Sequence, residues 1–563
     1  MEKRLVLAII LSFLLLLVWQ LVIVKKSPEL QTPAEQTVPV QTGQVQPVPE
    51  QKKADVAAPQ PPAQKTDKPL NIKQIAANNE DKITLGTSLY QAVWSNKGGV
   101  LTSWKLRQHK DEKKEDLDLV PISAKDAGVY PFSLYDDAPD AVKAGLPGIV
   151  SSVYNSALFK VTGSSREIRD GEKAEIRFNY ADGKELEIEK IFTFYGGRYD
   201  FDIAVSIRRK GQPVEPRILW GPGIGNPSEN ELKQSFGSGG GATVLASTNL
   251  YRVDEKKYKP EQSAFNFVNW AAYDDNYFAA LFLPAAAGAG TAAFLKVDVE
   301  NKVSYFFLAA ANPGKAFVGP KDFDALTAFG HEAKKIVRFG FFGFIAEILF
   351  VTLKFIHKFV PNWGFAIIIL TFIIKVLFFP LTYHSTKSMA KMADLQPKIK
   401  ALRAKYKKSK TDIAQRRQMN EEMMKLYKEN GVNPAGGCLP MLLQIPVFFG
   451  LFSLLRAAIE LRQSPWIFWI KDLSIKDPLF ITPLLMGATQ FISQKMTPTT
   501  ADPSQAKMML IMPVVMTFFF MNFQSGLVIY WLASNVLQIG QQYLMNSLIH
   551  KKKVESHGKP RKK

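Results

Sequence analysis

The chain has 563 residues, enough for two or more domains, and a formal net charge of +20. Residues 1–350 carry 42 Lys and Arg against 41 Asp and Glu, whereas residues 351–563 carry 29 against 10. One cysteine, Cys438, excludes an internal disulfide and a cysteine metal cluster, and the six histidines lack metal-ligand spacing. We therefore expect no metal, no other cofactor, no enzymatic activity and no DNA binding. A basic membrane module joined to a neutral soluble domain explains the charge.

The N-terminal segment predicts a membrane anchor. Residues 5–24 are almost wholly apolar and follow Lys3 and Arg4. Such a run can span a hydrocarbon core of about 30 Å. A cleaved signal peptide is the alternative, but the run is long and no A-x-A site follows closely. We expect an uncleaved anchor over residues 1–26, with its N-terminus in the cytoplasm.

Two segments follow the anchor. Residues 27–75 are rich in Pro, Gln, Val and Ala, a composition typical of a disordered linker. Residues 76–330 predict strands, because apolar residues alternate with polar ones on both sides of the turn Asp182-Gly183. Repeated short strands indicate a large antiparallel sandwich. A carbohydrate enzyme is an alternative for this domain, but its carboxylates fall on alternating strand faces, where solvated surface is the ordinary explanation.

Residues 331–360 predict an amphipathic helix. Lys354 and Lys358 each lie within about 20° of Glu347 on a helix, opposite Phe and Ile side chains. This pattern favours a helix lying along the membrane interface over a helix that crosses the membrane.

Five further membrane spans are predicted within residues 361–549. The last apolar run, 508–549, is too long for one crossing, and residues 522–526 can break it. With the anchor the spans number six, which places the N-terminus and the basic tail, 550–563, in the cytoplasm and the strand domain outside. Two spans are short and are expected to thin the bilayer locally. The five spans are 363–383, 438–459, 478–494, 507–521 and 527–549.

Residues 384–430 predict a cytoplasmic helical hairpin. They carry 13 Lys and Arg against five acids, and Asp412 can cap a second helix. We expect the hairpin to dock to something acidic, such as the ribosome, anionic lipid headgroups or an incoming chain. An inert, solvated hairpin is the alternative.

A candidate site lies within the spans. Lys375 sits among apolar residues in the middle of its span, where a charge costs about 2.5–3.5 kcal/mol and usually faces a bundle interior or a wet cavity. Snorkelling of the long side chain to the inner surface is the alternative. Polar residues on the same face or in other spans can line one hydrophilic groove with it, although single polar residues commonly join helices. The candidates are Lys375, Thr371, Gln444, Trp531, Asn535 and Gln538.

Three motifs resemble the signature of the YidC membrane protein insertases, in their diderm-bacterial form. They are NPAGGCLPMLLQIP at 433–446, LMGAT at 485–489 with QKM at 494–496, and SGLVIYW at 525–531. The resemblance implies a periplasmic β-supersandwich and a five-helix core around a groove open to cytoplasm and lipid. It also implies that the groove's positive residue, usually Arg, is Lys375, which keeps the charge but loses the planar fork.

The function implied is insertion and folding of nascent membrane proteins, alone or with the Sec translocon. Lys375 and water would solvate the polar segment of a client, while its apolar segment enters lipid along 438–459 and 507–521. No Gly-x-x-x-x-Gly-Lys-Ser/Thr motif occurs, so no nucleotide hydrolysis is implied. A small-solute transporter and a passive envelope scaffold remain the alternatives. A transporter is expected to show inverted repeats and paired polar groups at mid-membrane.

Overall fold

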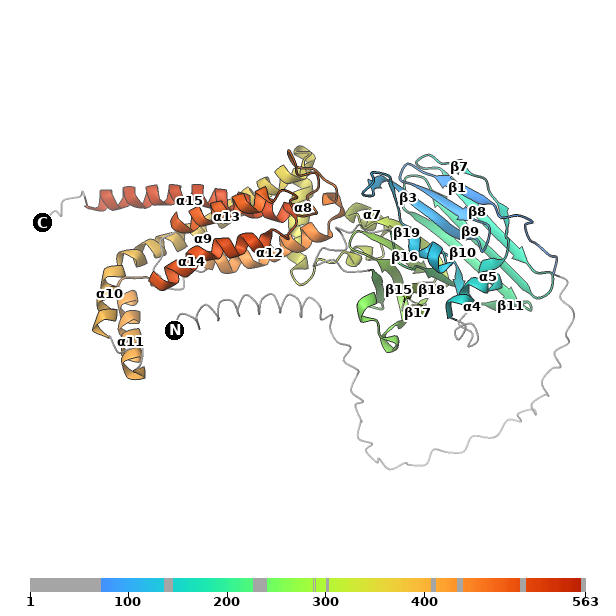
Figure 1. The fold of residues 1–563 in the computed structure, drawn as a ribbon, viewed down its shortest axis with the longest axis horizontal. Coiled ribbons are helices and arrows are strands. Elements are labelled where there is room, and N and C mark those ends of the chain that lie inside the picture. The colour runs from blue at the N-terminus through green and yellow to red at the C-terminus, as the bar shows by residue number, and fades with distance from the viewer. Residues whose placement is uncertain are drawn as a thin grey trace, which may run out of the picture.

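The computed structural model describes most of the chain in two regions, a strand-rich part and a helical part (Figure 1). The described residues are 72–135, 145–225, 240–286, 288, 290–299, 303–406, 412–432, 439–496 and 503–557. The predicted anchor, 1–26, and the linker up to residue 71 lie outside them. So do Cys438 and the last residues of the predicted tail.

The strand-rich part, here called the β domain, contains two sheets within the described residues. The smaller sheet has the order β4-β3-β2-β1-β7, in which β1 and β7 are parallel and the other pairs antiparallel. Its strands are β1 (Lys82–Gly86), β2 (Tyr90–Ser95), β3 (Val100–Lys110), β4 (Asp116–Asp118) and β7 (Arg166–Glu167).

The larger sheet is antiparallel and has the order β5-β12-β18-β17-β15-β16-β19-β10-β9-β8-β6, with β11 beside β10 and the β13-β14 hairpin beside β15. The described strands of this sheet are β5 (Leu134–Tyr135), β6 (Lys160–Thr162), β8 (Lys173–Ala181), β9 (Leu186–Tyr195), β10 (Asp200–Arg209), β11 (Gln212–Val214), β12 (Arg217–Trp220), β13 (Gly241–Ala246), β14 (Asn249–Asp254), β15 (Ala264–Asp274), β16 (Phe278–Pro284), β17 (Gly290–Val299), β18 (Val303–Ala311) and β19 (Pro313–Pro320).

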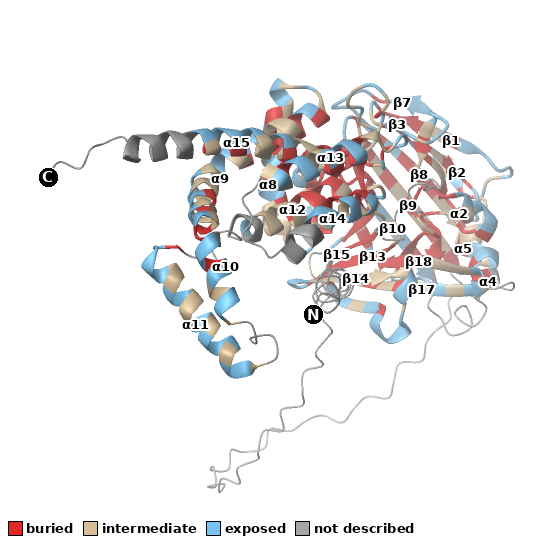
Figure 2. Cartoon of the chain, turned by 60° about the vertical axis from the view of Figure 1, so that its left-hand side comes forward, coloured by how far each residue is buried: buried red, intermediate tan, exposed pale blue. Residues whose placement is uncertain are grey.

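The predicted strand pattern is confirmed at the hairpin that was clearest in the sequence. β8 and β9 pair across Asp182-Gly183, where Gly183 has φ +75° and Asp182 accepts three backbone N–H bonds. Apolar side chains on one face of each strand meet those of the smaller sheet. The resulting core is red in Figure 2 and includes the fully buried Trp94, Trp104 and Trp220. The β domain is therefore sandwich-like.

Short helices flank the strands, and a run of long helices follows them. The short elements are α2 (Ile122–Ala127), α4 (Gly145–Ser151), α5 (Val153–Ser156), η1 (Glu255–Lys257), η2 (Pro260–Gln262), α7 (Phe323–Phe329) and η3 (Ala333–Ile336). The helical part comprises α8 (Gly343–Phe359), α9 (Trp363–Asp394), α10 (Gln396–Lys405), α11 (Ile413–Glu429), α12 (Leu439–Ala457), η5 (Ile459–Leu461), α13 (Ile481–Met496), α14 (Pro503–Phe520) and α15 (Ser525–His557).

Two predicted span limits differ from the helices. α9 does not end at residue 383 but continues to Asp394, because no Gly or Pro interrupts residues 384–394. α10 then begins with Pro397 in its first turn. α14 begins at Pro503, before the predicted start at 507, since proline is favourable at a helix start.

Among the described residues, α9 is the one helix long and apolar enough to cross a membrane by itself. Leu443–Ala457 and Leu510–Phe520 are shorter apolar helical stretches. The break predicted at 522–526 is present, since α14 ends at Phe520 and α15 begins at Ser525. The count of six spans remains a prediction.

The helices α8, α9 and α12 to α15, here called the bundle, share one apolar core. α8 packs its inner face on α12 and α9, and Gly450 of α12 admits Ile345 closely. Its outer face exposes Phe344, Val351 and Phe355 beside the charged Lys354. The helix covers Gly343–Phe359 rather than all of 331–360, and its position along the membrane interface remains a prediction.

The predicted hairpin is formed by the end of α9 with α10 and α11, and it projects from the bundle in Figure 1. Met392, Leu395, Ile399 and Val432 form a small apolar core between the arms. Asp412 caps α11, accepting from the N–H groups of Ala414 and Gln415.

The β domain meets the bundle along a seam beside η5. The Lys110 carbonyl, at the end of β3, accepts from Gln463 at 2.8 Å and Arg462 at 3.2 Å. Lys354 of α8 pairs with Asp324 of α7. The residues that join β3 to the bundle are more than 350 positions apart in the sequence. This contact therefore depends on tertiary structure alone.

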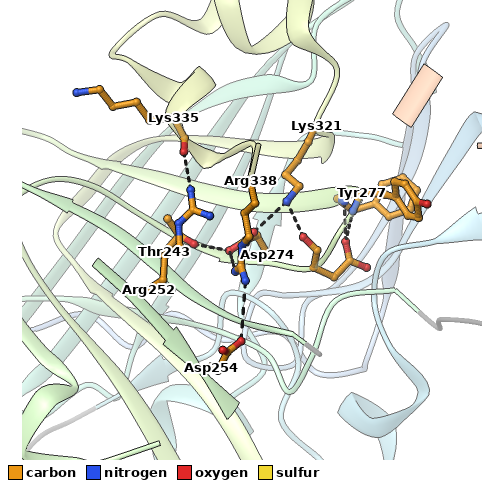
Figure 3. A network of polar contacts seen from close by, with 10 residues as sticks. Thr243, Arg252, Asp254, Asp274, Tyr277, Lys321, Lys335 and Arg338 are labelled. Atoms are coloured by element: carbon orange, nitrogen blue, oxygen red, sulfur yellow. Dashed lines mark hydrogen bonds and ion pairs between the residues drawn. The ribbon is translucent and has the colours of Figure 1, made fainter. Parts of the chain in front are cut away.

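A buried charge network holds the chain where it leaves the β domain (Figure 3). The Asp274 carboxylate meets Lys321 at 3.0 Å, Arg338 at 3.1 Å and the Thr243 hydroxyl at 2.6 Å. Arg252 of β14 donates to the Lys335 carbonyl at 2.8 Å. The segment leading into α8 is thus fastened to β14 and β15.

Candidate client site in the helical bundle

Lys375 of α9 bonds to the neighbouring helix α15. Its Nζ donates to Gln538 Oε1 at 3.0 Å, and both side chains are half-buried. Among the described residues, this neutral amide is the hydrogen-bond partner of Lys375, and no carboxylate pairs with it. The ammonium therefore lies inside the bundle with its charge uncompensated.

The position of Lys375 on α9 follows from the helical period. Ile367, Leu370 and Ile374 are buried in the bundle core, whereas Val376 and Leu377 are 55% and 72% exposed. Lys375 lies between these two arcs of the helix surface. It therefore stands at the margin between the packed interior and the apolar outer surface.

Two further candidates pair with residues that the sequence did not single out. Gln444 of α12 donates to the Tyr530 hydroxyl on α15. Trp531 donates its indole N–H to Gln490 Oε1 of α13 at 3.2 Å, and its ring contacts Phe448 and Phe520. Polar contacts thus link α15 to α12 and α13 as well as to α9.

Asn535 and Thr371 form hydrogen bonds within the packed helices. Asn535 is buried, and its amide donates to the Met486 carbonyl at 3.1 Å and the Thr489 hydroxyl at 3.4 Å. Thr371 is also buried, and its hydroxyl donates to the Ile367 carbonyl one turn back on α9. These contacts are typical of helix packing, so a groove-lining role for both residues stays a prediction.

Five of the six candidates take part in hydrogen bonds that involve α15, as separate pairs, whereas Thr371 bonds within α9. Lys375 and Gln538 meet directly, whereas Gln444, Trp531 and Asn535 each bind a different neighbour. Gln490 was missed by sequence reasoning, although it lies in the short fourth span and a search for amides in spans finds it. Tyr530 carries no such signal, because aromatic residues are ordinary in spans.

Other chemistry finds little support in the described residues. No group of three His, Cys, Asp or Glu side chains there could hold a metal ion. The β domain has an open cavity of about 440 Å³ lined in part by Lys315, His331 and Glu332. Its charged groups are already paired, Glu332 with Lys335 and Lys315 with Asp200.

Comparisons with known proteins agree with this architecture. The family described as "YidC periplasmic domain" matches residues 82–352, and "60Kd inner membrane protein" matches residues 355–553. The "Membrane protein insertase YidC" of Syntrophus aciditrophicus is 38% identical over 97% of this chain and 99% of its own length. The chain belongs to the YidC membrane protein insertase family.

Other YidC proteins are similar over the same extent. The "Membrane protein insertase YidC" of Pelobacter propionicus is 35% identical over 98% of this chain and all of its own length. A solved structure, "Active YidC insertase crystal structure with the first transmembrane domain resolved", is 19% identical, with a TM-score of 0.37, covering 84% of this chain and 94% of that chain. The two matched family regions meet between residues 352 and 355, within α8.

Proposed function

We propose that this chain inserts membrane proteins into the bacterial inner membrane and assists their folding. Clients enter the membrane through a positively charged, hydrophilic groove around Lys375. The protein inserts them either alone or together with the Sec translocon. The protein crosses the membrane six times, with both termini in the cytoplasm and the β domain in the periplasm. Its proposed partners are nascent membrane proteins, the ribosome, the Sec translocon and anionic lipids. DNA is not among the proposed partners.

Lys375 is the observation that carries this proposal. It lies on an apolar helix, points to α15 and has a neutral partner at 3.0 Å. A structural charge at such a site is normally paired, because an unpaired buried charge is costly. A cation left uncompensated can instead attract carboxylates and water of a passing polar segment.

The sequence and packing of the other helices support a route beside Lys375. α12 and α14 expose apolar side chains, including Leu443, Val514 and Phe518, on which an apolar client segment can slide into lipid. α13 has 16 residues, about 24 Å of helix, which is less than the hydrocarbon core. A thinner bilayer there shortens the path of the polar segment.

The basic hairpin supports reception of clients at the cytoplasmic side. Its residues 384–430 carry a net positive charge, and several cations such as Arg416 and Arg417 are exposed on α11. The basic tail, 550–563, adds to this surface. Such surfaces suit the phosphates of ribosomal RNA and anionic lipid headgroups.

Charge reversal at Lys375 tests the proposal. Lys375→Glu should abolish insertion of a client with an acidic translocated tail, measured by protease protection in reconstituted vesicles. Lys375→Arg should retain it, because the charge is kept. Normal insertion of this client by the Glu variant would refute the proposed role of Lys375 and of the groove around it.

A further inference from the structure

Lys375 lies where an isolated lysine would snorkel. In α9 only six apolar residues, 376–381, follow it before the polar part of the helix, a rise of about 9 Å. A long flexible stem ordinarily carries the ammonium toward the water at that end. The structure shows the opposite arrangement, with Nζ held by Gln538 of α15.

Gln538 is well placed to hold the ammonium. It follows the buried Asn535 by about one turn and precedes the buried Gln542 by another, on the face of α15 that packs against its neighbours. Gln542 is only 2% exposed and its amide bonds Asn546 within α15, so buried residues flank Gln538 on both sides along this face of the helix. The acceptor oxygen is therefore presented from a packed face of α15 toward α9.

The neutrality of Gln538 matters as much as its position. An ammonium has three donors, and Gln538 accepts one of them, which leaves two for water or a client. A carboxylate at this position would pair with Lys375 and cancel its charge. An apolar side chain would leave the ammonium without its partner in the bundle.

We infer that Gln538 is a positioning residue, whose side-chain carbonyl keeps the Lys375 ammonium inside the bundle while leaving its positive charge available. This inference rests on the proposed function and deepens it. Segments that carry carboxylates, or backbone carbonyls stripped of water, are the client chemistry that two free N–H donors and a net charge recognise.

Chemical labelling of Lys375 tests the positioning directly. Full-length protein in inside-out vesicles is treated with a membrane-impermeant acylating reagent, and modification of Lys375 is compared with that of the exposed Lys387. Gln538→Met should raise the ratio of Lys375 modification to Lys387 modification about tenfold, because one charge-assisted hydrogen bond is lost. Gln542→Met, one turn away, should leave the ratio unchanged. A folded Gln538→Met protein with the wild-type ratio would overturn the inference.

Gln538→Glu supplies a second test that does not depend on the Met variant folding. The acceptor remains, so the labelling ratio should stay low. Insertion of an acidic-tailed client should fall about tenfold, while insertion of a neutral-tailed client should persist, because the added carboxylate compensates Lys375. Equal loss for both clients would indicate a merely structural role and would also overturn the inference.

Lys375→Leu separates this inference from the proposed function. If Lys375→Leu inserts the acidic client normally, the proposed groove is refuted, whatever the Gln538 variants show. If Lys375→Leu loses insertion but Gln538→Met leaves both labelling and insertion unchanged, the groove stands and only the positioning role fails.

Discussion

In the β domain, the fully buried Asp274 is met by Lys321, Arg338 and the Thr243 hydroxyl. In the bundle, Lys375 is met by one uncharged oxygen of Gln538. Burial raises the pKa of Asp274, but Arg338 and Lys321 together bring it below its usual value. The difference teaches that this protein compensates a charge where the charge holds the fold together, and leaves it uncompensated where we propose that a client is bound.

Lys190 of the β domain, like Lys375, bonds neutral oxygens, but it differs from Lys375 in the number of donors that are satisfied. It is fully buried, and its Nζ donates to the carbonyls of Gly98, Gly99 and Phe132 at 2.7, 3.3 and 2.9 Å. All three ammonium donors therefore have acceptors, and the side chain ties the two sheets together. Burial lowers the pKa of Lys190 to about 7.

The largest expected effect breaks the compensated network. Asp274→Ala removes the anion that Lys321 and Arg338 share, leaving Arg338 only Asp254 at 3.9 Å, and should cost about 3–5 kcal/mol of unfolding free energy. Tryptophan fluorescence of the full-length protein during urea unfolding measures this cost. Asp298→Ala, which removes an exposed ion pair with Lys296, is the matched control and should have little effect.

The same measurement on Lys375→Met completes the comparison. Its stability should equal or exceed that of the wild type, because an uncompensated charge is removed. If Lys375→Met and Asp274→Ala destabilise the protein equally, the contrast between the two regions is wrong.

A smaller effect concerns how the bundle packs. A Cβ on Gly487 of α13 would lie 1.9 Å from Thr517 Oγ1 of α14, so Gly487→Ala should cost about 1–3 kcal/mol. Adding Thr517→Ala should recover part of the loss in thermal unfolding, since the clashing atom is gone. Gly540→Ala on α15 meets no atom within 4 Å and should not destabilise. Similar losses at both glycines would show that contact between α13 and α14 is not the cause.

The smallest effect lies at the seam between the regions, and it depends on pH. Burial and Asp322 raise the pKa of Glu460 to about 7, whereas burial and Arg462 lower the pKa of His109 to about 4. Between about pH 4.5 and 6.5, the folded state binds more protons at Glu460 and fewer at His109 than the unfolded state does. The two contributions therefore oppose each other, and the buried Asp275, whose pKa burial raises to about 6, adds a slope that the wild type and the variants share.

Single variants should reveal the two opposing slopes. Glu460→Gln leaves His109, so stability relative to the wild type should fall as pH falls from 6.5 to 4.5. His109→Gln leaves Glu460, so stability relative to the wild type should rise over the same interval. Urea midpoints at the two pH values measure each slope relative to that of the wild type, and relative slopes of the same sign in the two variants would contradict the assignment.

Local sequence patterns predicted much of the fold. Alternation around Asp182-Gly183 specified the β8-β9 hairpin, Asp412 specified the start of α11, and polar residues near 522–526 specified the break between α14 and α15. These features depend on residues a few positions apart, whose spacing sets strand faces, caps and turns. The end of α9 and the start of α14 differ from the predicted span limits, since apolarity marks a span but does not stop a helix.

The sequence by itself determined that Lys375 is a cation on an apolar helix, and that amides occur in the later spans. Only the tertiary structure decided that Lys375 meets Gln538, that Trp531 meets Gln490, and that Asp274 collects Lys321 and Arg338. These partners are 41 to 163 positions apart. Their pairing depends on how whole helices and strands pack, which no local spacing specifies.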